Sequence, residues 1–124
     1  MRPKDQGTAE ETWAVNWFRG LGFPAGRLPE GGANDVGDVL VELPSGDFLV
    51  VEVKSRSNLV VHRAVQGAHR KAMAGHLDVL PLGGIVWWKR LVRKDGKQRR
   101  VPDGETRVVS MNLEVLEALL KGGG

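Results

Sequence analysis

The apolar positions near the start of the chain recur with the period of an α-helix. They are Trp13, Ala14, Trp17, Phe18 and Leu21, and this spacing predicts an amphipathic helix that packs one face on the core. Thr8, followed three residues later by Glu11, matches a capping box, in which the Thr8 hydroxyl caps the helix and Glu11 reaches back. The helix is therefore expected to begin near Thr8 and to end at residues 20–22.

Apolar runs later in the chain predict four strands and two more helices. Strands are expected at residues 38–43, 48–55, 85–92 and 106–111, and helices at residues 59–79 and 112–122, the last one capped by Asn112. Residues 44–47 are short enough to join the first two strands as an antiparallel hairpin, whereas residues 24–37 are expected to form a loop. This order of elements predicts an α/β fold with a mixed central sheet flanked by helices.

Length and composition are those of one ordinary soluble domain. The chain has 124 residues, of which 41% are hydrophobic and 27% are charged. We expect a single domain over residues 1–124, with flexible ends at residues 1–6 and 122–124. No apolar stretch approaches the roughly 20 residues of a membrane-spanning helix and no signal peptide opens the chain, so a cytoplasmic location is expected. The absence of cysteine excludes disulfides and thiolate zinc sites.

The positive charge is clustered along the chain. A net charge of +3 with such clustering favours nucleic acid as a partner, although a solvated basic face is an equally common reason for it. The densest cluster surrounds the Asp95-Gly96 turn signal and comprises Lys89, Arg90, Arg93, Lys94, Lys97, Arg99 and Arg100. We expect this hairpin to contact DNA phosphates, with protection of a sheet edge as the alternative. Trp87 and Trp88 precede it on opposite faces of their strand, so one of them is expected in the core.

Three charged residues stand out on the two central strands. Asp38 opens the first strand, and Glu52 and Lys54 lie on the second. Side chains two residues apart on a strand share one face, at a separation of roughly 7 Å. Because buried charges are costly unless they are paired or bind a metal, a metal site is the favoured explanation. A solvated Glu–Lys pair and a simple strand cap at Asp38 are the alternatives.

Magnesium suits these residues, because it takes oxygen ligands and keeps several waters beside one or two carboxylates. Asp38 and Glu52 are the expected carboxylate ligands and the backbone carbonyl of Val53 is a third, with Mn²⁺ expected to substitute for Mg²⁺. Lys54 is placed to orient an attacking water and to stabilise negative charge in the hydrolysis of a phosphodiester. A glutamate from the first helix would complete the acidic cluster.

With these residues in place, the chain resembles the PD-(D/E)XK nuclease superfamily, and within it the archaeal-type Holliday junction resolvases. The matching segments are Gly7-Thr8-Ala9-Glu10-Glu11, Gly22-Phe23, Arg27, Gly37-Asp38-Val39-Leu40, Glu52-Val53-Lys54-Ser55-Arg56 and Leu113-Glu114-Val115-Leu116. The resemblance implies a restriction-endonuclease-like fold and magnesium-dependent cleavage of four-way DNA junctions, in recombination and repair, by a homodimer with paired sites. It also implies that Glu11, rather than Glu10, is the catalytic and metal-binding glutamate of the helix, so Glu10→Gln is expected to stay active.

The resemblance and the flanking positive charges together give the DNA-binding candidates, which are Arg27, Ser55, Arg56, Arg63, Arg70 and Lys71. The loop after Arg27 lacks the serine that such resolvases commonly carry, which bears on junction preference more than on cleavage. Asp35 stays open as a rival for Asp38. Gln66 lies where other branches of the superfamily use glutamine, although a surface glutamine is the plainer interpretation.

The histidines of the helix expected at residues 59–79 are not candidates for a shared metal. His62, His69 and His76 follow one another at seven-residue intervals, about 10 Å per step along a helix, which is too far for two of them to share a metal.

The alternatives to a junction-resolving endonuclease are another branched-DNA or repair nuclease of the same superfamily and a basic DNA-binding module without catalysis.

Overall fold

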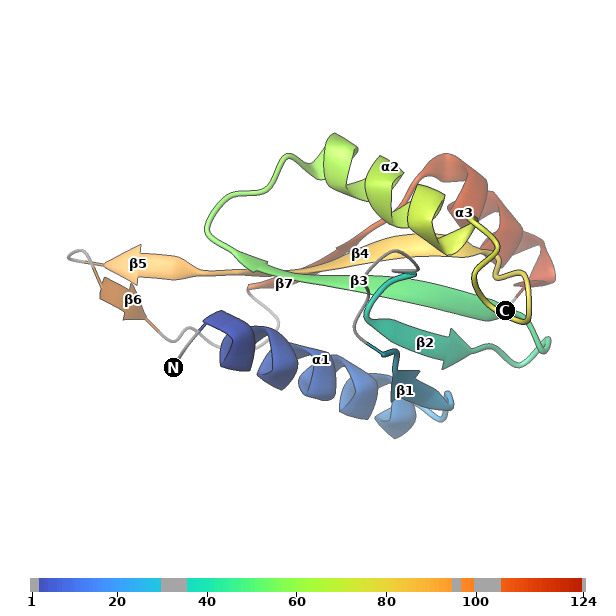
Figure 1. The fold of residues 1–124 in the computed structure, drawn as a ribbon, viewed down its shortest axis with the longest axis horizontal. Coiled ribbons are helices and arrows are strands. Elements are labelled where there is room, and N and C mark those ends of the chain that lie inside the picture. The colour runs from blue at the N-terminus through green and yellow to red at the C-terminus, as the bar shows by residue number, and fades with distance from the viewer. Residues whose placement is uncertain (1–2, 30–35, 95–96, 100–105, 124) are drawn as a thin grey trace.

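A five-stranded mixed sheet lies at the centre of the protein in the order β1-β2-β3-β4-β7 (Figure 1). The computed structural model describes residues 3–29, 36–94, 97–99 and 106–123. The strands are β1 (Ala25–Arg27), β2 (Val39–Glu42), β3 (Phe48–Arg56), β4 (Gly83–Arg90) and β7 (Arg107–Ser110). One side of the sheet is covered by α1 (Pro3–Gly20), and α2 (Val61–Ala72) and α3 (Leu113–Ala118) lie on the other. The expected α/β fold, with a mixed sheet flanked by helices, is confirmed.

The pairing of the strands places β3 at the middle of the sheet. β2 and β3 form the predicted antiparallel hairpin, with Val39 opposite Val51 and Glu42 opposite Phe48. β3 then pairs with β4 in parallel, after the crossover through α2. β1 and β7 add to the two edges in antiparallel orientation. Side chains at the centre of β3 are therefore held between two hydrogen-bonded neighbours.

Alternate residues of β3 serve opposite faces of the sheet, as the two-residue period of a strand requires. Leu49, Val51 and Val53 pack in the main core with residues of α1. Glu52 and Lys54 point to the other face, toward α2. The predicted shared face of Glu52 and Lys54 is thereby confirmed. Trp87 of β4 is buried in the main core, which confirms that one of the two adjacent tryptophans packs inside.

Gly84 allows α2 to lie directly against β4. A Cβ atom at this position would meet the backbone carbonyl of Ala68 in α2, as well as the side chain of Ala72. Because backbone atoms cannot move aside cheaply, only glycine permits this close approach. The contact fixes the height of α2 above the sheet and so shapes the space between α2 and the neighbouring β3.

The first helix begins earlier than the sequence predicts. α1 starts at Pro3, so Thr8 and Glu11 lie inside the helix and the capping-box prediction is wrong. Proline is well tolerated at the first helical position, where its missing N–H has no intrahelical partner in any case. The helix thus includes residues 3–6, which were expected to be a flexible end.

Two other boundaries differ from the predictions. The expected loop at residues 24–37 contains β1, a three-residue strand too short to show alternation, which forms through pairing with β2. α2 covers residues 61–72 rather than 59–79, and Gly75 follows it with a φ of +86°, a left-handed conformation that favours glycine and does not continue a helix.

The end of the chain follows the prediction more closely. Asn112 caps α3, because its side-chain oxygen accepts a hydrogen bond of 2.9 Å from the N–H of Val115. A π-helical turn at Leu119–Gly123 follows. A separate two-stranded sheet joins β5 (Val92–Lys94) to β6 (Lys97–Arg99) in antiparallel orientation. Within the part of the chain that the structure describes, no helix is both long and apolar enough to cross a membrane.

Candidate active site

The strand hairpin brings Asp38 next to the Glu52-Val53-Lys54 segment. Asp38 lies immediately before β2, and one of its carboxylate oxygens, Oδ2, accepts a hydrogen bond of 2.7 Å from the backbone N–H of Val53. Paired residues of antiparallel strands exchange both of their backbone hydrogen bonds, so the N–H and C=O of one residue point to the same side. The Val53 carbonyl therefore lies on the edge of β3 that Asp38 occupies. Two of the predicted ligands meet at that edge, beside Glu52.

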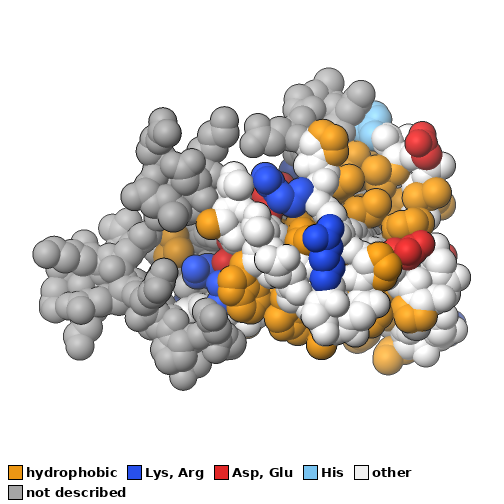
Figure 2. Space-filling model, turned by 90° about the horizontal axis from the view of Figure 1, so that it is seen from below, with side chains coloured by type: hydrophobic (Ala, Val, Ile, Leu, Met, Phe, Trp, Pro, Cys, Tyr) orange, Lys and Arg blue, Asp and Glu red, His pale blue; other side chains and the backbone are white. Residues whose placement is uncertain are grey.

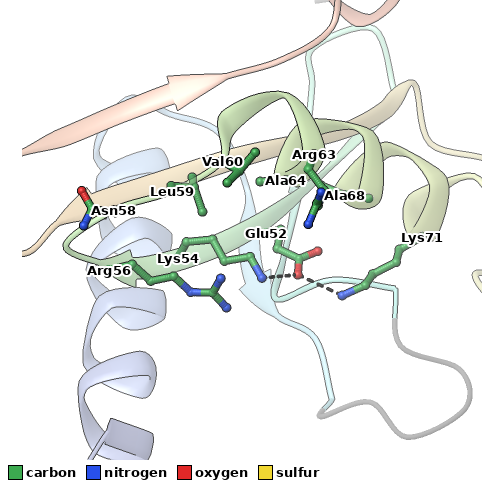
Figure 3. A pocket seen from close by; sticks show the side chains of 11 residues that line it. Glu52, Lys54, Arg56, Asn58, Leu59, Val60, Arg63, Ala64, Ala68 and Lys71 are labelled. Carbon is green, nitrogen blue, oxygen red and sulfur yellow. Dashed lines mark hydrogen bonds and ion pairs between the residues drawn. The ribbon is translucent and has the colours of Figure 1, made fainter.

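Glu52 is a buried carboxylate with two lysines on one of its oxygens. Only 7% of the residue is exposed. Its Oε1 atom lies 3.2 Å from Nζ of Lys54 and 2.9 Å from Nζ of Lys71, which reaches down from the last turn of α2 (Figure 3). The second oxygen, Oε2, is buried and accepts no hydrogen bond from any described residue. A buried carboxylate oxygen without a donor is costly, and a bound cation would relieve that cost.

A pocket of about 400 Å³ opens between β3 and α2 beside this carboxylate. Among the described residues that line it, four are cationic, which are Lys54, Arg56, Arg63 and Lys71, and one is acidic, which is Glu52. Leu59 and residues 64 and 68 of α2 form an apolar part of the wall. An excess of positive charge in a concave site attracts anions. The pocket therefore suits a phosphate-bearing ligand.

The opposite face of the molecule has a different character. Figure 2 views the protein from the side of α1, where hydrophobic side chains are interspersed with separate Lys and Arg side chains over the described residues. Trp17 and Leu21 at the end of α1 are 44% and 58% exposed. The four described cations that line the pocket beside Glu52 lie on the α2 side of the sheet.

Glu11 and Arg27 form an ion pair beside β1. The Arg27 Nε atom lies 3.1 Å from Oε1 of Glu11. β1 is joined to the start of β2, since the N–H of Leu28 donates to the carbonyl of Asp38 at 2.8 Å. Arg27 therefore lies one residue before the backbone contact with Asp38. The ion pair between Glu11 and Arg27 was not predicted from the sequence.

The acidic residues are consistent with a magnesium site of two carboxylates. Among the described residues, no group of three or more histidine and carboxylate side chains has a geometry that could hold a metal ion. Magnesium does not need such a group, because one or two carboxylates with waters and substrate oxygens suffice. Asp38 and the Val53 carbonyl lie at one edge of β3, and the unsatisfied Oε2 of the neighbouring Glu52 is the specific observation that favours a cation.

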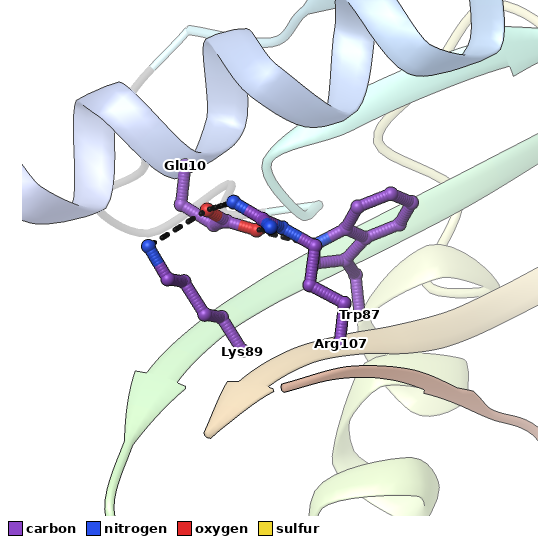
Figure 4. A network of polar contacts seen from close by, with 4 residues as sticks. All are labelled: Glu10, Trp87, Lys89 and Arg107. Carbon is purple, nitrogen blue, oxygen red and sulfur yellow. Dashed lines mark hydrogen bonds and ion pairs between the residues drawn. The ribbon is translucent and has the colours of Figure 1, made fainter. Parts of the chain in front are cut away.

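Glu10 has a role that the sequence analysis missed. It is 3% exposed, and its carboxylate accepts hydrogen bonds from Nε1 of Trp87 at 2.7 Å and from Nε and Nη2 of Arg107 at 2.8 and 2.9 Å (Figure 4). The Arg107 guanidinium also stacks 3.6 Å from the ring centre of Trp13. Helical spacing did not single out Glu10, because Glu10 precedes Trp13 and Trp17 by the same three and seven residues by which Glu11 precedes Ala14 and Phe18.

This network makes Glu10 a structural residue between α1 and the sheet. A buried carboxylate bonded to an arginine in a two-point geometry is among the stronger polar contacts in proteins. That Glu10→Gln stays active remains a prediction, but the burial of Glu10 and its pairing with Arg107 mean that the variant should also lose stability.

The other DNA-binding candidates divide between the pocket and its surroundings. Arg56, Arg63 and Lys71 line the pocket. Arg70 is exposed and is not among the lining residues. Ser55 lies between two pocket-facing positions of β3, so its side chain points to the other face of the sheet, where its hydroxyl is buried and has no partner among the described residues.

Those of the remaining candidates that the structure describes do not line the pocket. Gln66 is exposed on α2 and does not line the pocket. Nδ1 of His69 accepts a hydrogen bond of 3.3 Å from the N–H of Gly84, and its Nε2 lies 3.6 Å from the Glu114 carboxylate, so it joins α2 to β4 and α3. His62 and His76 are exposed. Asp35, the Asp95-Gly96 turn and Arg100 lie outside the described residues.

Comparison of the sequence with protein-family models and with curated proteins found no match in either case. Any assignment of function therefore rests on the motifs in the sequence and on the geometry described above.

Proposed function

We propose that the protein is a magnesium-dependent endonuclease of the PD-(D/E)XK type, with a restriction-endonuclease-like fold, that cuts DNA phosphodiesters. The observation that carries the proposal is the hydrogen bond from the Val53 N–H to the Asp38 carboxylate. It connects the aspartate of one strand to the Glu52-Val53-Lys54 segment of the next, which is the arrangement that the sequence motif requires. The cationic pocket beside Glu52 supports a nucleic acid as the ligand.

The residues have distinct tasks in this proposal. Asp38, Glu52 and the Val53 carbonyl would hold the magnesium ion, which supplies a polarised water and neutralises charge on the phosphate when it is bound. Lys54, 3.2 Å from Glu52, would stabilise negative charge on the scissile phosphate. Arg56 and Arg63 would hold neighbouring phosphates from the pocket wall. By the resemblance, Glu11 would complete the acidic cluster from α1, where its carboxylate pairs with Arg27.

The proposed substrate is branched DNA, with the four-way junction first. This part rests on the resemblance to junction resolvases, since a junction with two-fold symmetry needs paired cuts and a symmetric dimer supplies paired sites. A homodimer is supported by an uncovered apolar edge of the sheet. Val108 and Val109, on the two faces of β7, are 47% and 44% exposed, and Leu113 at the start of α3 is 80% exposed. Because exposed apolar patches commonly mark interfaces, this edge is the candidate for dimerisation.

A non-catalytic DNA-binding module is the second candidate. The ion pairs of Glu52 with Lys54 and Lys71 favour it, because a carboxylate already compensated by two cations can stand in a structural network without a metal. Both candidates predict DNA binding, but only the endonuclease predicts strand cleavage that depends on a metal.

The test uses a labelled four-way junction and the wild-type protein. The endonuclease is expected to cut the junction in magnesium, and in calcium to bind it without cutting, because calcium ligates carboxylates but rarely supports this chemistry. Binding in both ions with intact strands throughout would establish the non-catalytic module instead. A nuclease that prefers another branched DNA as its substrate would cut flaps or forks faster than the four-way junction.

A further inference from the structure

Two lysines share one oxygen of Glu52 while the other oxygen has no donor among the described residues. Lys54 and Lys71 both approach Oε1, at 3.2 and 2.9 Å, and Oε2 is buried without a hydrogen bond. The local charge of this group of three is positive, because two ammonium groups face one carboxylate. A divalent cation that binds Glu52 must therefore compete with two ammonium groups for this carboxylate.

The two lysines are not equivalent. Lys54 comes from β3, two residues from Glu52, and its side chain is 22% exposed. Lys71 comes from the last turn of α2, and its side chain is 39% exposed and lines the pocket. A lysine side chain is a flexible four-carbon stem with a point charge at its end. Lys71 is thus the cation that can move away from Glu52 into the pocket without a change in the backbone.

We propose that Lys71 couples metal binding to DNA binding by exchanging its partner. In the metal-free protein Lys71 holds Glu52, and it weakens the affinity for a divalent cation through charge repulsion. A DNA phosphate in the pocket gives Lys71 another anion, which releases Glu52 for the metal. This inference rests on the proposed metal-dependent function and adds a means of regulating it, because the site binds its metal well only when DNA is present.

Coupling of this kind is reciprocal. If DNA raises the affinity for the metal by some factor, the metal must raise the affinity for DNA by the same factor. The coupling is carried by one side chain, so removing the ammonium group of Lys71 removes the competition and the coupling together. Lys71→Met keeps most of the stem length without charge, while Lys71→Arg keeps the charge.

The experiment is a calorimetric titration of each protein with calcium, with and without a synthetic four-way junction, since calcium avoids cutting. Lys71→Met is expected to bind calcium about tenfold more tightly than the wild type in the absence of DNA, the effect of one nearby charge on a dication. The junction should tighten calcium binding in the wild type and do so much less in Lys71→Met. Lys71→Arg should behave as the wild type.

Lys121→Met is the matched control. This variant also removes one lysine charge and one lysine–glutamate ion pair, because Nζ of Lys121 lies 2.7 Å from Oε1 of Glu117. Neither residue lines the pocket. The variant is expected to leave the affinity for calcium unchanged. Melting temperatures measured with and without calcium check that each variant is folded, and the calcium-induced rise should be larger for Lys71→Met than for the wild type.

The outcomes separate the inference from the proposed function. If the wild type and Lys71→Met bind calcium equally tightly without DNA, or if the junction tightens calcium binding equally in both, the exchange by Lys71 is overturned while the metal site stands. If no protein binds calcium with or without the junction, the metal-dependent function and this inference are both overturned.

Discussion

The carboxylate of Asp38 accepts a 2.7 Å hydrogen bond from the backbone N–H of Val53, the residue between Glu52 and Lys54. This contact determines how the site is assembled. The strand directs the side chains of residues 52 and 54 to the α2 face. Asp38 lies immediately before Val39, the first residue of β2, and its side chain contacts the backbone of β3 at Val53. A loop aspartate is thereby fixed against the central strand of the sheet.

Removing either carboxylate charge is expected to stop cleavage while DNA binding persists. Asp38→Asn keeps an oxygen that can accept the Val53 N–H, and Glu52→Gln keeps the shape of the buried side chain, so both should fold. Loss of metal ligation should lower the cleavage rate by about a hundredfold or more, whereas the phosphate contacts remain.

The control for these variants is Asp47→Asn, in the turn of the same hairpin, where Asp47 contacts Ser45. Cleavage of a labelled junction and binding in a gel-shift assay should be normal for Asp47→Asn. Near wild-type cutting by Asp38→Asn or Glu52→Gln would show that the catalytic site is elsewhere.

Lys54→Ala is expected to impair cleavage and to leave the affinity for divalent cations equal or tighter. Lys54 is a cation 3.2 Å from a proposed ligand of the metal, so its removal lowers local repulsion while it removes charge stabilisation from the transition state. Junction cleavage in magnesium and calorimetry with calcium measure the two effects separately. If calcium binding is lost, the lysine serves to hold Glu52 in place and not to assist the reaction.

Glu10→Gln is expected to destabilise the protein by about 3 kcal/mol, because it removes the charge from a buried partner of Arg107. Urea unfolding monitored by tryptophan fluorescence is a direct measurement, since Trp87 donates to this carboxylate. Glu117→Gln, which breaks only the exposed pair with Lys121, should change the unfolding free energy by less than about 0.5 kcal/mol. Equal stability of the two variants would contradict a structural role for Glu10.

The variant Glu11→Gln distinguishes a catalytic role of Glu11 from a role limited to its ion pair with Arg27. Its contact with Arg27 is partly exposed, so the loss should cost less than about 1 kcal/mol of stability. If Glu11 belongs to the reaction site, the variant is folded and inactive, which is the expected result. A melting temperature near that of the wild type combined with full cleavage activity would limit Glu11 to its pairing with Arg27.

The hairpin and the face shared by Glu52 and Lys54 could be predicted from the sequence because both depend on local rules. The two-residue period of a strand sets the directions of its side chains, and a four-residue turn sets the pairing of its neighbours. The capping-box rule is also local, but it predicted a helix start near Thr8, whereas the helix begins five residues earlier, at Pro3.

The contact between Lys71 and Glu52 could not be predicted in this way. It depends on how α2 is seated on the sheet, which the close approach at Gly84 controls, and no periodic pattern encodes that distance. The distinction between Glu10 and Glu11 could not be predicted from spacing either. Glu10 precedes Trp13 and Trp17 by three and seven residues, and Glu11 precedes Ala14 and Phe18 by the same intervals, so both glutamates fit the apolar face of the helix.

The most direct test of the central claim is a cleavage panel with magnesium, using labelled four-way junction, flap, fork, duplex and single strand with the wild type and Glu52→Gln in parallel. The account predicts that the wild type cuts branched DNA, the junction fastest, that chelation of magnesium stops the reaction, and that Glu52→Gln binds the junction without cutting it. Intact strands for every substrate with the wild type, or equal cutting by Glu52→Gln, would contradict the assignment of a metal-dependent nuclease site to Asp38, Glu52 and Lys54.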